Sequence, residues 1–169
     1  MNLFPMKAFK IILLIVTPLL IFSCKPSARS AADYNNRLVK HQTKVGELQR
    51  ELFAVFKDGK AEEMKQILDR FKSQIREISD SVSSIPQFDG NDDFKKATLS
   101  YLEQMNAMAE NECTEIIRLY SIPDTIFYQT DEKKVSILRA QINIKTSKAI
   151  NELGNSQQKF AEFHHFKID

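Results

Sequence analysis

Several residue types are scarce in this chain of 169 residues. It has no tryptophan, two cysteines, four glycines and five prolines. Two cysteines cannot build a disulfide scaffold, and so few turn-forming residues argue against a β-sandwich, which needs many tight turns. With 43% hydrophobic and 27% charged residues, the composition also excludes a disordered tail and a polytopic membrane protein.

The sequence motifs of common catalytic, phosphate-binding and metal-binding sites are missing as well. The sequence has no glycine-rich phosphate loop, no nucleophile elbow and no paired metal-ligand motif. It also lacks a basic patch and the interleaving of aromatic and basic residues that is typical of nucleic-acid binding. We therefore expect a protein that is not an enzyme, carries no cofactor and does not bind nucleic acid.

The N-terminus has the layout of a secretory signal. Lys7 and Lys10 precede a 12-residue apolar run from Ile11 to Phe22, and a small residue, Ser23, follows it. The run is too short for a membrane span, which takes about 20 residues. A positive flank, a short apolar core and a small residue before a break indicate a signal peptide over residues 1–23.

The end of this segment, Ile21-Phe22-Ser23-Cys24, resembles the lipobox of bacterial lipoproteins. The resemblance implies that Cys24 is diacylated, that the signal is cut before it, and that its new amino group is acylated. Two or three acyl chains would anchor the protein stably in a membrane. The alternative is an uncleaved N-terminal anchor with an ordinary cysteine. Either way, we expect a membrane-tethered domain outside the cytoplasm.

The residues after Cys24 bear on the membrane that holds the protein. By the same resemblance, Lys25 favours the outer membrane over the inner one, because Asp at that position is the inner-membrane signal. No acidic cluster of the kind that marks surface-exported lipoproteins follows Cys24. The periplasmic face is therefore slightly favoured, and the surface face stays an open alternative.

Residues 1–23 carry only Lys7 and Lys10 as charges, so the remaining chain has 22 basic and 22 acidic residues and a formal net charge of zero.

The rest of the chain reads as a flexible tether over residues 24–32 and a helical domain over 33–166. Apolar residues recur at spacings of three, four and seven, which is the period of amphipathic helices, and no stretch alternates with a period of two. The four apolar stripes run from Tyr34 to Val55, Met64 to Ile85, Phe94 to Tyr120, and Val135 to Phe163. Four helices with short connections predict an antiparallel up-down-up-down four-helix bundle.

The third and fourth helices should be longer than the first two and overshoot them at the end far from the tether. Four apolar residues in the connection form the candidate partner-binding site: Ile122, Ile126, Phe127 and Tyr128. Exposed, such a patch would mark a site for a protein partner. The favoured alternative is that residues 121–129 fold back as a lid over the core, because so apolar a segment is more cheaply buried.

A second candidate site involves histidines. His41 and the pair His164-His165 should lie near the same end of the bundle, and Glu162 is spaced from His165 as in the Glu-x-x-His motif of di-iron bundles. The motif occurs only once here, so His41, Glu162 and His165 are only a weak alternative as metal ligands, and we expect no metal. His41 reads better as a polar position in the first stripe.

Other side chains have simpler interpretations. Cys113 reads as a small buried apolar residue rather than a nucleophile, and Glu110 as a residue on the wet face. Phe160 and Phe163 continue the fourth stripe and should plug the core, whereas Phe166 should be exposed.

Two stretches resemble small bacterial lipoproteins of unknown function from Bacteroidetes and spirochaetes: Tyr34-Asn35-x-x-Leu38-Val39-x-x-Gln42 and Phe88-Asp89-Gly90-Asn91-Asp92-Asp93-Phe94-Lys95-x-Ala97-x-x-x-Tyr101-Leu102. These are described as surface proteins, and the resemblance covers most of residues 24–165. It implies no catalytic residues. We therefore expect a membrane-anchored lipoprotein with a protein-interaction or envelope-structural role, or alternatively a bundle that binds a small ligand or a metal.

Overall fold

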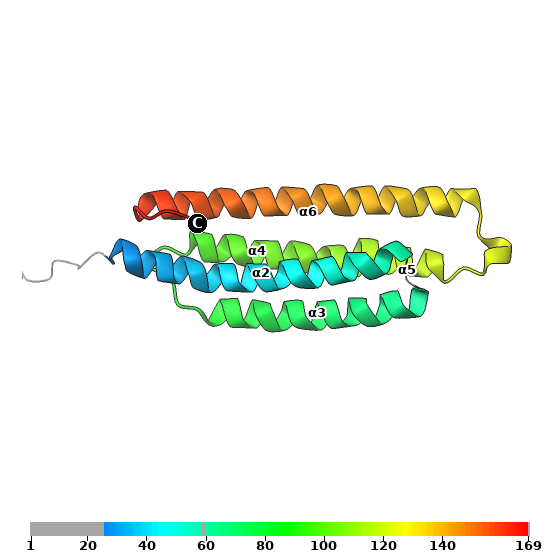
Figure 1. Ribbon diagram of the computed structural model, residues 1–169, viewed down its shortest axis with the longest axis horizontal. Coiled ribbons are helices and arrows are strands. Elements are labelled where there is room, and N and C mark those ends of the chain that lie inside the picture. The colour runs from blue at the N-terminus through cyan, green and yellow to red at the C-terminus, as the bar shows by residue number, and fades with distance from the viewer. Residues whose placement is uncertain (1–25, 59, 169) are drawn as a thin grey trace, which may run out of the picture.

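The structure, a computed structural model, describes residues 26–58 and 60–168. Three of its long helices are α2 (Ala28–Asp58), α3 (Ala61–Ser84) and α6 (Gln129–Phe163). Between α3 and α6 the chain forms one more long rod, the third in chain order, and successive rods point in opposite directions (Figure 1). The prediction of an all-α, up-down-up-down bundle is confirmed.

The third rod is a single helix with a widened turn. It consists of α4 (Asp93–Met108), a π-helical turn η2 (Ala109–Cys113) and α5 (Thr114–Tyr120). A π-turn disturbs the regular hydrogen bonding of the helix. Two side chains donate hydrogen bonds to backbone carbonyl oxygens at this turn. Thr114 Oγ1 donates to Ala109 O at 3.1 Å, and Asn111 Nδ2 donates to Ala107 O at 2.7 Å.

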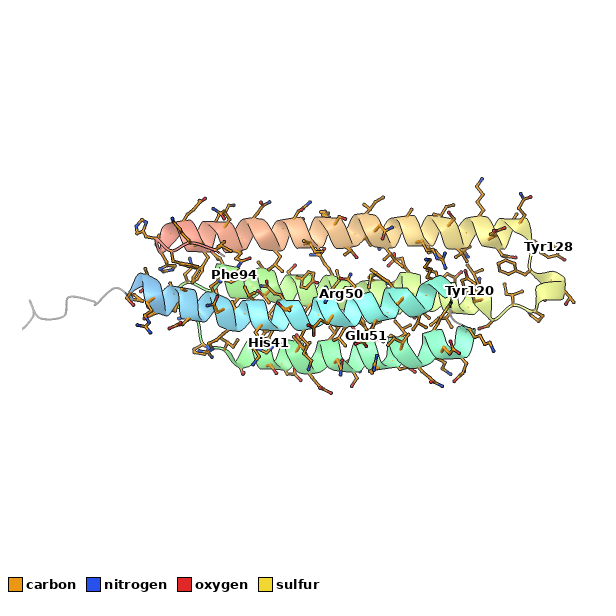
Figure 2. The ribbon with its side chains drawn as sticks, viewed as in Figure 1. His41, Arg50, Glu51, Phe94, Tyr120 and Tyr128 are labelled. Atoms are coloured by element: carbon orange, nitrogen blue, oxygen red, sulfur yellow. The ribbon has the colours of Figure 1, made fainter. Side chains whose placement is uncertain are left out.

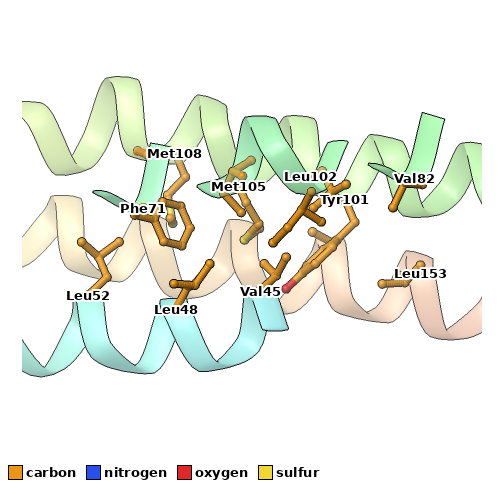
Figure 3. Close-up of a cluster of buried hydrophobic side chains, with 14 of the residues drawn as sticks. Val45, Leu48, Leu52, Phe71, Val82, Tyr101, Leu102, Met105, Met108 and Leu153 are labelled. Atoms are coloured by element: carbon orange, nitrogen blue, oxygen red, sulfur yellow. The ribbon is translucent and has the colours of Figure 1, made fainter. Parts of the chain in front are cut away.

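Residues of all four rods form one continuous apolar core (Figure 3). Met105 and Met108 of α4 lie in this core together with Leu48 and Leu52 of α2 and Phe71 of α3 (Figure 3). The predicted stripes supply most of this core, since 21 of their spaced apolar positions are buried: Tyr34, Leu38, Val45, Leu48, Leu52, Met64, Phe71, Ile75, Ile78, Val82, Ile85, Phe94, Tyr101, Met105, Met108, Ile116, Val135, Ile142, Ala149, Leu153 and Phe160.

The first helix begins earlier than the predicted tether allowed. Residues 24–32 were expected to be a flexible tether, but α2 begins at Ala28. The hydroxyl oxygen of Ser27 accepts a hydrogen bond from the backbone N–H of Ser30 at 3.1 Å, which is how serine caps a helix N-terminus. Ala31 is fully buried, so core packing also holds this first turn helical.

The last helix ends differently from the prediction. Phe163 was expected in the core and Phe166 in solvent, and both expectations are wrong. Phe163 is 68% exposed, and Phe166 is half-buried against the core. The chain turns back at His165, whose φ is 56°, and the backbone N–H of Phe166 donates to Ala161 O at 3.1 Å. This is the Schellman geometry, which brings the residue after the turn onto the helix.

One side of the bundle is held mainly by polar contacts. α6 packs chiefly on α4, whereas its contact with α2 is slight. Three hydrogen bonds bridge α2 and α6: Gln157 Nε2 to Asn35 Oδ1 at 3.0 Å, Gln49 Nε2 to Thr146 Oγ1 at 3.2 Å, and Arg139 to the carbonyl oxygen of Phe56 at 2.6 Å. The α2–α6 side is therefore the loosest seam of the bundle.

Candidate interaction site at the distal end

The distal loop, residues 121–128, joins α5 to α6 and contains a short 3-10 turn, η3 (Asp124–Ile126). It lies at the end of the bundle opposite to Ala28 and beyond the ends of α2 and α3 (Figure 1). Tyr128 stands at its extremity and Tyr120 at its base (Figure 2). Since α6 has 35 residues, this loop is about 52 Å from the other end of that helix.

The four residues predicted as a partner-binding site divide into two pairs. Ile126 and Tyr128 are 52% and 66% exposed, whereas Ile122 and Phe127 are half-buried. The loop therefore does not act as a closed lid in which all four side chains are buried. Tyr120, which the predicted site left out, is 39% exposed at the base of the loop (Figure 2).

Ion pairs connect the end of α5 to the start of α6, the two helix ends that carry the distal loop. We call these two helix ends the stem. The carboxylate of Glu115 in α5 accepts hydrogen bonds from Arg118 at 2.7 and 2.9 Å and from Lys134 of α6 at 2.5 Å. These hydrogen bonds from two cations lower the pKa of Glu115 from 4.5 to about 2. At the start of α6, the Asp131 carboxylate accepts the backbone N–H of Tyr128 at 3.0 Å. Both ends of the loop are thus anchored to the bundle.

A groove opens beside this stem, on the loose side of the bundle. We call it the α2–α6 groove. It has a volume of about 250 Å³, and its lining residues come from α2, α5 and α6: Phe53, Phe56, Lys57, Ile116, Arg139, Ile142 and Asn143. Its floor is apolar, since Phe56, Ile116 and Ile142 are at most 5% exposed. The lining includes two cationic side chains and no carboxylate.

Arg139 links the α2–α6 groove to the distal loop. One terminal nitrogen of its guanidinium donates to Phe56 O at 2.6 Å and to the Tyr120 hydroxyl at 3.1 Å, and the guanidinium carbon lies 6.0 Å from the centre of the Tyr120 ring. Within the described residues, neither Arg139 nor Lys57 forms a salt bridge. Sequence reasoning missed this groove, because its walls come from three separate helices.

The polar residues of the loose seam had a signal that the sequence analysis did not use. Asn35, Gln42 and Gln49 follow one another at seven-residue spacing beside the apolar stripe of α2. Asn35 and Gln49 bond to α6 across the loose seam, whereas Gln42 Nε2 donates to Thr98 Oγ1 of α4 at 3.1 Å. Asn35 and Gln49 are buried. Repeated amides at one heptad position could have indicated a polar seam, because buried amides need partners on a neighbouring helix.

The weak alternative of a metal site finds no support. His41 lines a groove between α2 and α3 together with Lys40, Lys44 and Glu77, whereas Glu162 and His165 are exposed at the end of α6. Burial and the neighbouring cations lower the pKa of His41, and the same cations would repel a metal ion. No group of three or more metal-ligating side chains lies together anywhere in residues 26–58 and 60–168.

The third histidine belongs to an aromatic cluster at the proximal end. The His164 ring lies 4.6 Å from Phe160, 5.1 Å from Phe88 and 4.9 Å from Phe163, centre to centre. Burial lowers the pKa of His164, although the nearby Asp89 acts in the opposite direction. Phe88 reaches the cluster through a tight turn in which Asp89 and Gly90 both have positive φ. The cluster is part of the packing that closes this end.

The side chains around the π-turn show no activated nucleophile. Cys113 is fully buried, and burial raises the pKa of its thiol to about 12, which agrees with its interpretation as an apolar core residue. Glu110 is exposed as expected, but Glu112 is buried and pairs with Lys145 of α6. The sequence did not predict this ion pair, because Lys145 lies 33 residues from Glu112 in the chain and no local pattern connects the two residues.

In comparisons with known proteins, no family model, no curated protein and no solved structure matches the chain. None of the described helices combines the length and the apolar character that a membrane span requires. Cys24, the predicted lipidation site, and the predicted signal peptide lie outside the described residues.

Proposed function

We propose that this protein is a lipid-anchored, extracytoplasmic interaction module that presents its distal loop to a protein partner. The anchor is Cys24, which stands two residues before the first described residue and four before the start of α2. The partner site is the apolar surface of Tyr120, Ile126 and Tyr128, with Ile122 and Phe127 as its half-buried base. The lipoprotein signal and Lys25 favour the bacterial outer membrane.

A single observation carries this proposal. The exposed apolar side chains of the distal loop project at the end of the bundle farthest from Ala28 (Figures 1 and 2). Aromatic and aliphatic side chains grouped in this way are typical of surfaces that a partner covers. A protein held at residue 24 by lipid would carry that surface about 50 Å away from the bilayer.

Site-specific photo-crosslinking in cells tests the partner site. A photoreactive residue replaces Ile126 or Tyr128 in turn, and the matched control replaces Ile144, which is 69% exposed in the middle of α6. We expect a discrete crosslinked species from the two loop positions and none from the control. Equal crosslinking at Ile144, or none at the loop, would contradict the proposal.

Substitutions then separate binding from folding. The double variant Ile126→Ser/Tyr128→Ser should lose the crosslinked species, detected through a probe at Tyr120, while its free energy of unfolding changes by about 0.5 kcal/mol or less per exposed site. Phe127→Ser should cost more stability, because Phe127 is half-buried. A double variant that unfolds would instead show that Ile126 and Tyr128 are parts of the core.

A further inference from the structure

We propose that the α2–α6 groove binds a small amphiphilic anion, namely a free carboxylate with a short apolar body. The groove combines an apolar floor with two cationic side chains, Lys57 and Arg139, and no acidic lining residue. Such binding needs neither the lipid anchor nor a partner at the distal loop.

The apolar part of the argument rests on the floor of the groove. Phe56, Ile116 and Ile142 are almost fully buried, and Phe53 is half-buried at the wall. An alkyl chain in this groove would bury its methylene groups against aromatic and aliphatic carbon, at about 0.8 kcal/mol for each CH₂, or roughly a fourfold gain in affinity. The volume of about 250 Å³ is below the range of drug-sized sites, so the ligand must be short.

The charged part of the argument rests on Arg139. Its two hydrogen bonds within the described chain use one terminal nitrogen and go to a carbonyl and a phenol oxygen, not to a carboxylate. A guanidinium has five N–H donors, so a carboxylate can still be held by the others. The half-buried position of Arg139 strengthens its attraction for an anion relative to a fully solvated cation.

Lys57 adds a second positive charge at the mouth of the groove. It is exposed and has no salt bridge among the residues that the structure describes. Arg139 donates to the carbonyl oxygen of Phe56, the residue before Lys57, so both cations belong to the same stretch of the lining. Because the floor is uncharged, the groove favours a ligand that joins one negative group to an apolar body. A neutral or cationic amphiphile of the same length lacks that match.

Equilibrium dialysis with octanoate tests the proposal. The full chain is held in phospholipid nanodiscs, and empty nanodiscs correct for partition of the probe into lipid. We expect saturable binding of octanoate that is at least tenfold tighter than that of octanol, octyltrimethylammonium or acetate. Equal affinity for octanol would reduce the groove to a purely apolar hollow, and the absence of saturable octanoate binding would overturn the proposal.

Variants locate the bound probe. Arg139→Gln should weaken octanoate binding by about tenfold or more, as expected for loss of a charge-assisted hydrogen bond. Lys57→Glu should weaken octanoate binding too. Because Lys57 is exposed, this variant should fold, and it therefore tests the site even if Arg139→Gln does not fold. The matched control is Arg50→Gln, one heptad before Lys57 on α2 and exposed, but outside the groove. Binding that is unchanged in Lys57→Glu, or lost equally in Arg50→Gln, would place the probe elsewhere.

Discussion

At the scale of single residues, Glu112 is a charged side chain in a buried position. Its side chain is only 8% exposed, and one carboxylate oxygen pairs with Lys145. The other oxygen, Oε2, is buried and has no hydrogen-bond partner. A buried carboxylate depends on its counter-ion, because an unpaired buried charge is costly. The π-turn that carries Glu112 thus introduces a polar constraint between the third and fourth rods.

This arrangement predicts an asymmetry between the two partners. Lys145→Met should lower the free energy of unfolding by about 1–3 kcal/mol, because it leaves the buried carboxylate without its partner. Adding Glu112→Gln to Lys145→Met should restore part of that loss. Urea denaturation followed by circular dichroism measures both.

The matched control is Lys148→Met, one turn along α6. Its ion pair with Glu152 is exposed, with 72% and 54% of the two side chains accessible, and such pairs contribute little. If Lys148→Met costs as much as Lys145→Met, burial of Glu112 does not determine the energy of its ion pair.

At the scale of elements, the joint between α5 and α6 sets how firmly the distal loop is held. Glu115 receives hydrogen bonds from Arg118 in its own helix and from Lys134 in α6. The pKa of Glu115 falls from 4.5 to about 2 in the folded protein. A depressed carboxyl pKa means that the folded state favours the charged form, so this joint stabilises the protein above about pH 4.5. The contribution is lost as the pH falls through about 2.

The pH dependence gives a specific prediction for Glu115→Gln. At pH 6 the variant should be less stable than the parent by about 0.2–1 kcal/mol, the range for partly exposed ion pairs. The difference should shrink between pH 4.5 and pH 2 and vanish at the lower end. Urea unfolding at several pH values across this window measures it.

Arg118→Gln serves as an intermediate case, because it removes one of the two cations and leaves Lys134 in place. Between pH 4.5 and pH 2, its loss of unfolding free energy should be smaller than that of the parent and larger than that of Glu115→Gln. Parallel stability curves for the parent and Glu115→Gln across the window would contradict a joint held by the Glu115 carboxylate.

At the scale of the whole molecule, the bundle has two structurally different ends. The proximal end carries the start of α2, the Schellman turn of α6 and the aromatic cluster around His164. The distal end carries the exposed loop and lies beside the α2–α6 groove. If Cys24 is lipidated, the proximal end faces the membrane and the distal end faces away from it.

Replacement of the predicted anchor tests this orientation. Cys24→Ala should abolish incorporation of labelled palmitate and abolish processing at residue 24, because both require the cysteine thiol. The bundle should still fold, since the described domain begins at residue 26. Labelling followed by gel analysis gives the measurement, and protease treatment of intact against permeabilised cells then separates the two faces of the outer membrane.

The second cysteine supplies the control. Cys113 is fully buried, so Cys113→Ala should keep the label at the level of the parent protein. Unchanged labelling in Cys24→Ala would contradict lipidation at Cys24. An unprocessed, unlabelled parent protein would favour the alternative of an N-terminal anchor with an ordinary cysteine.

The sequence alone was enough for the fold class and most of the core. Residues such as Leu38, Phe71 and Met105 were predicted in the core from spacing, because the period of an α-helix is a local property of the chain. The same reasoning failed at Phe163, the last residue of α6, because the chain turns back directly after it and Phe166 packs against the core in its place. His165 adopts a positive φ without being glycine, so no local residue announced the turn.

Tertiary structure alone decided the features on which the site depends. The pairing of buried Glu112 with Lys145, and the convergence of Phe53, Ile116 and Arg139 on one groove, involve residues from different helices. The exposure of Ile126 and Tyr128 depends on how the distal loop lies against the end of the bundle. Sequence periodicity states which face of each helix is buried, but not which neighbour covers it or where two helices separate. Those choices follow from how four rods of unequal length pack together, and that packing decided where the described part of the chain leaves apolar side chains exposed and opens the α2–α6 groove.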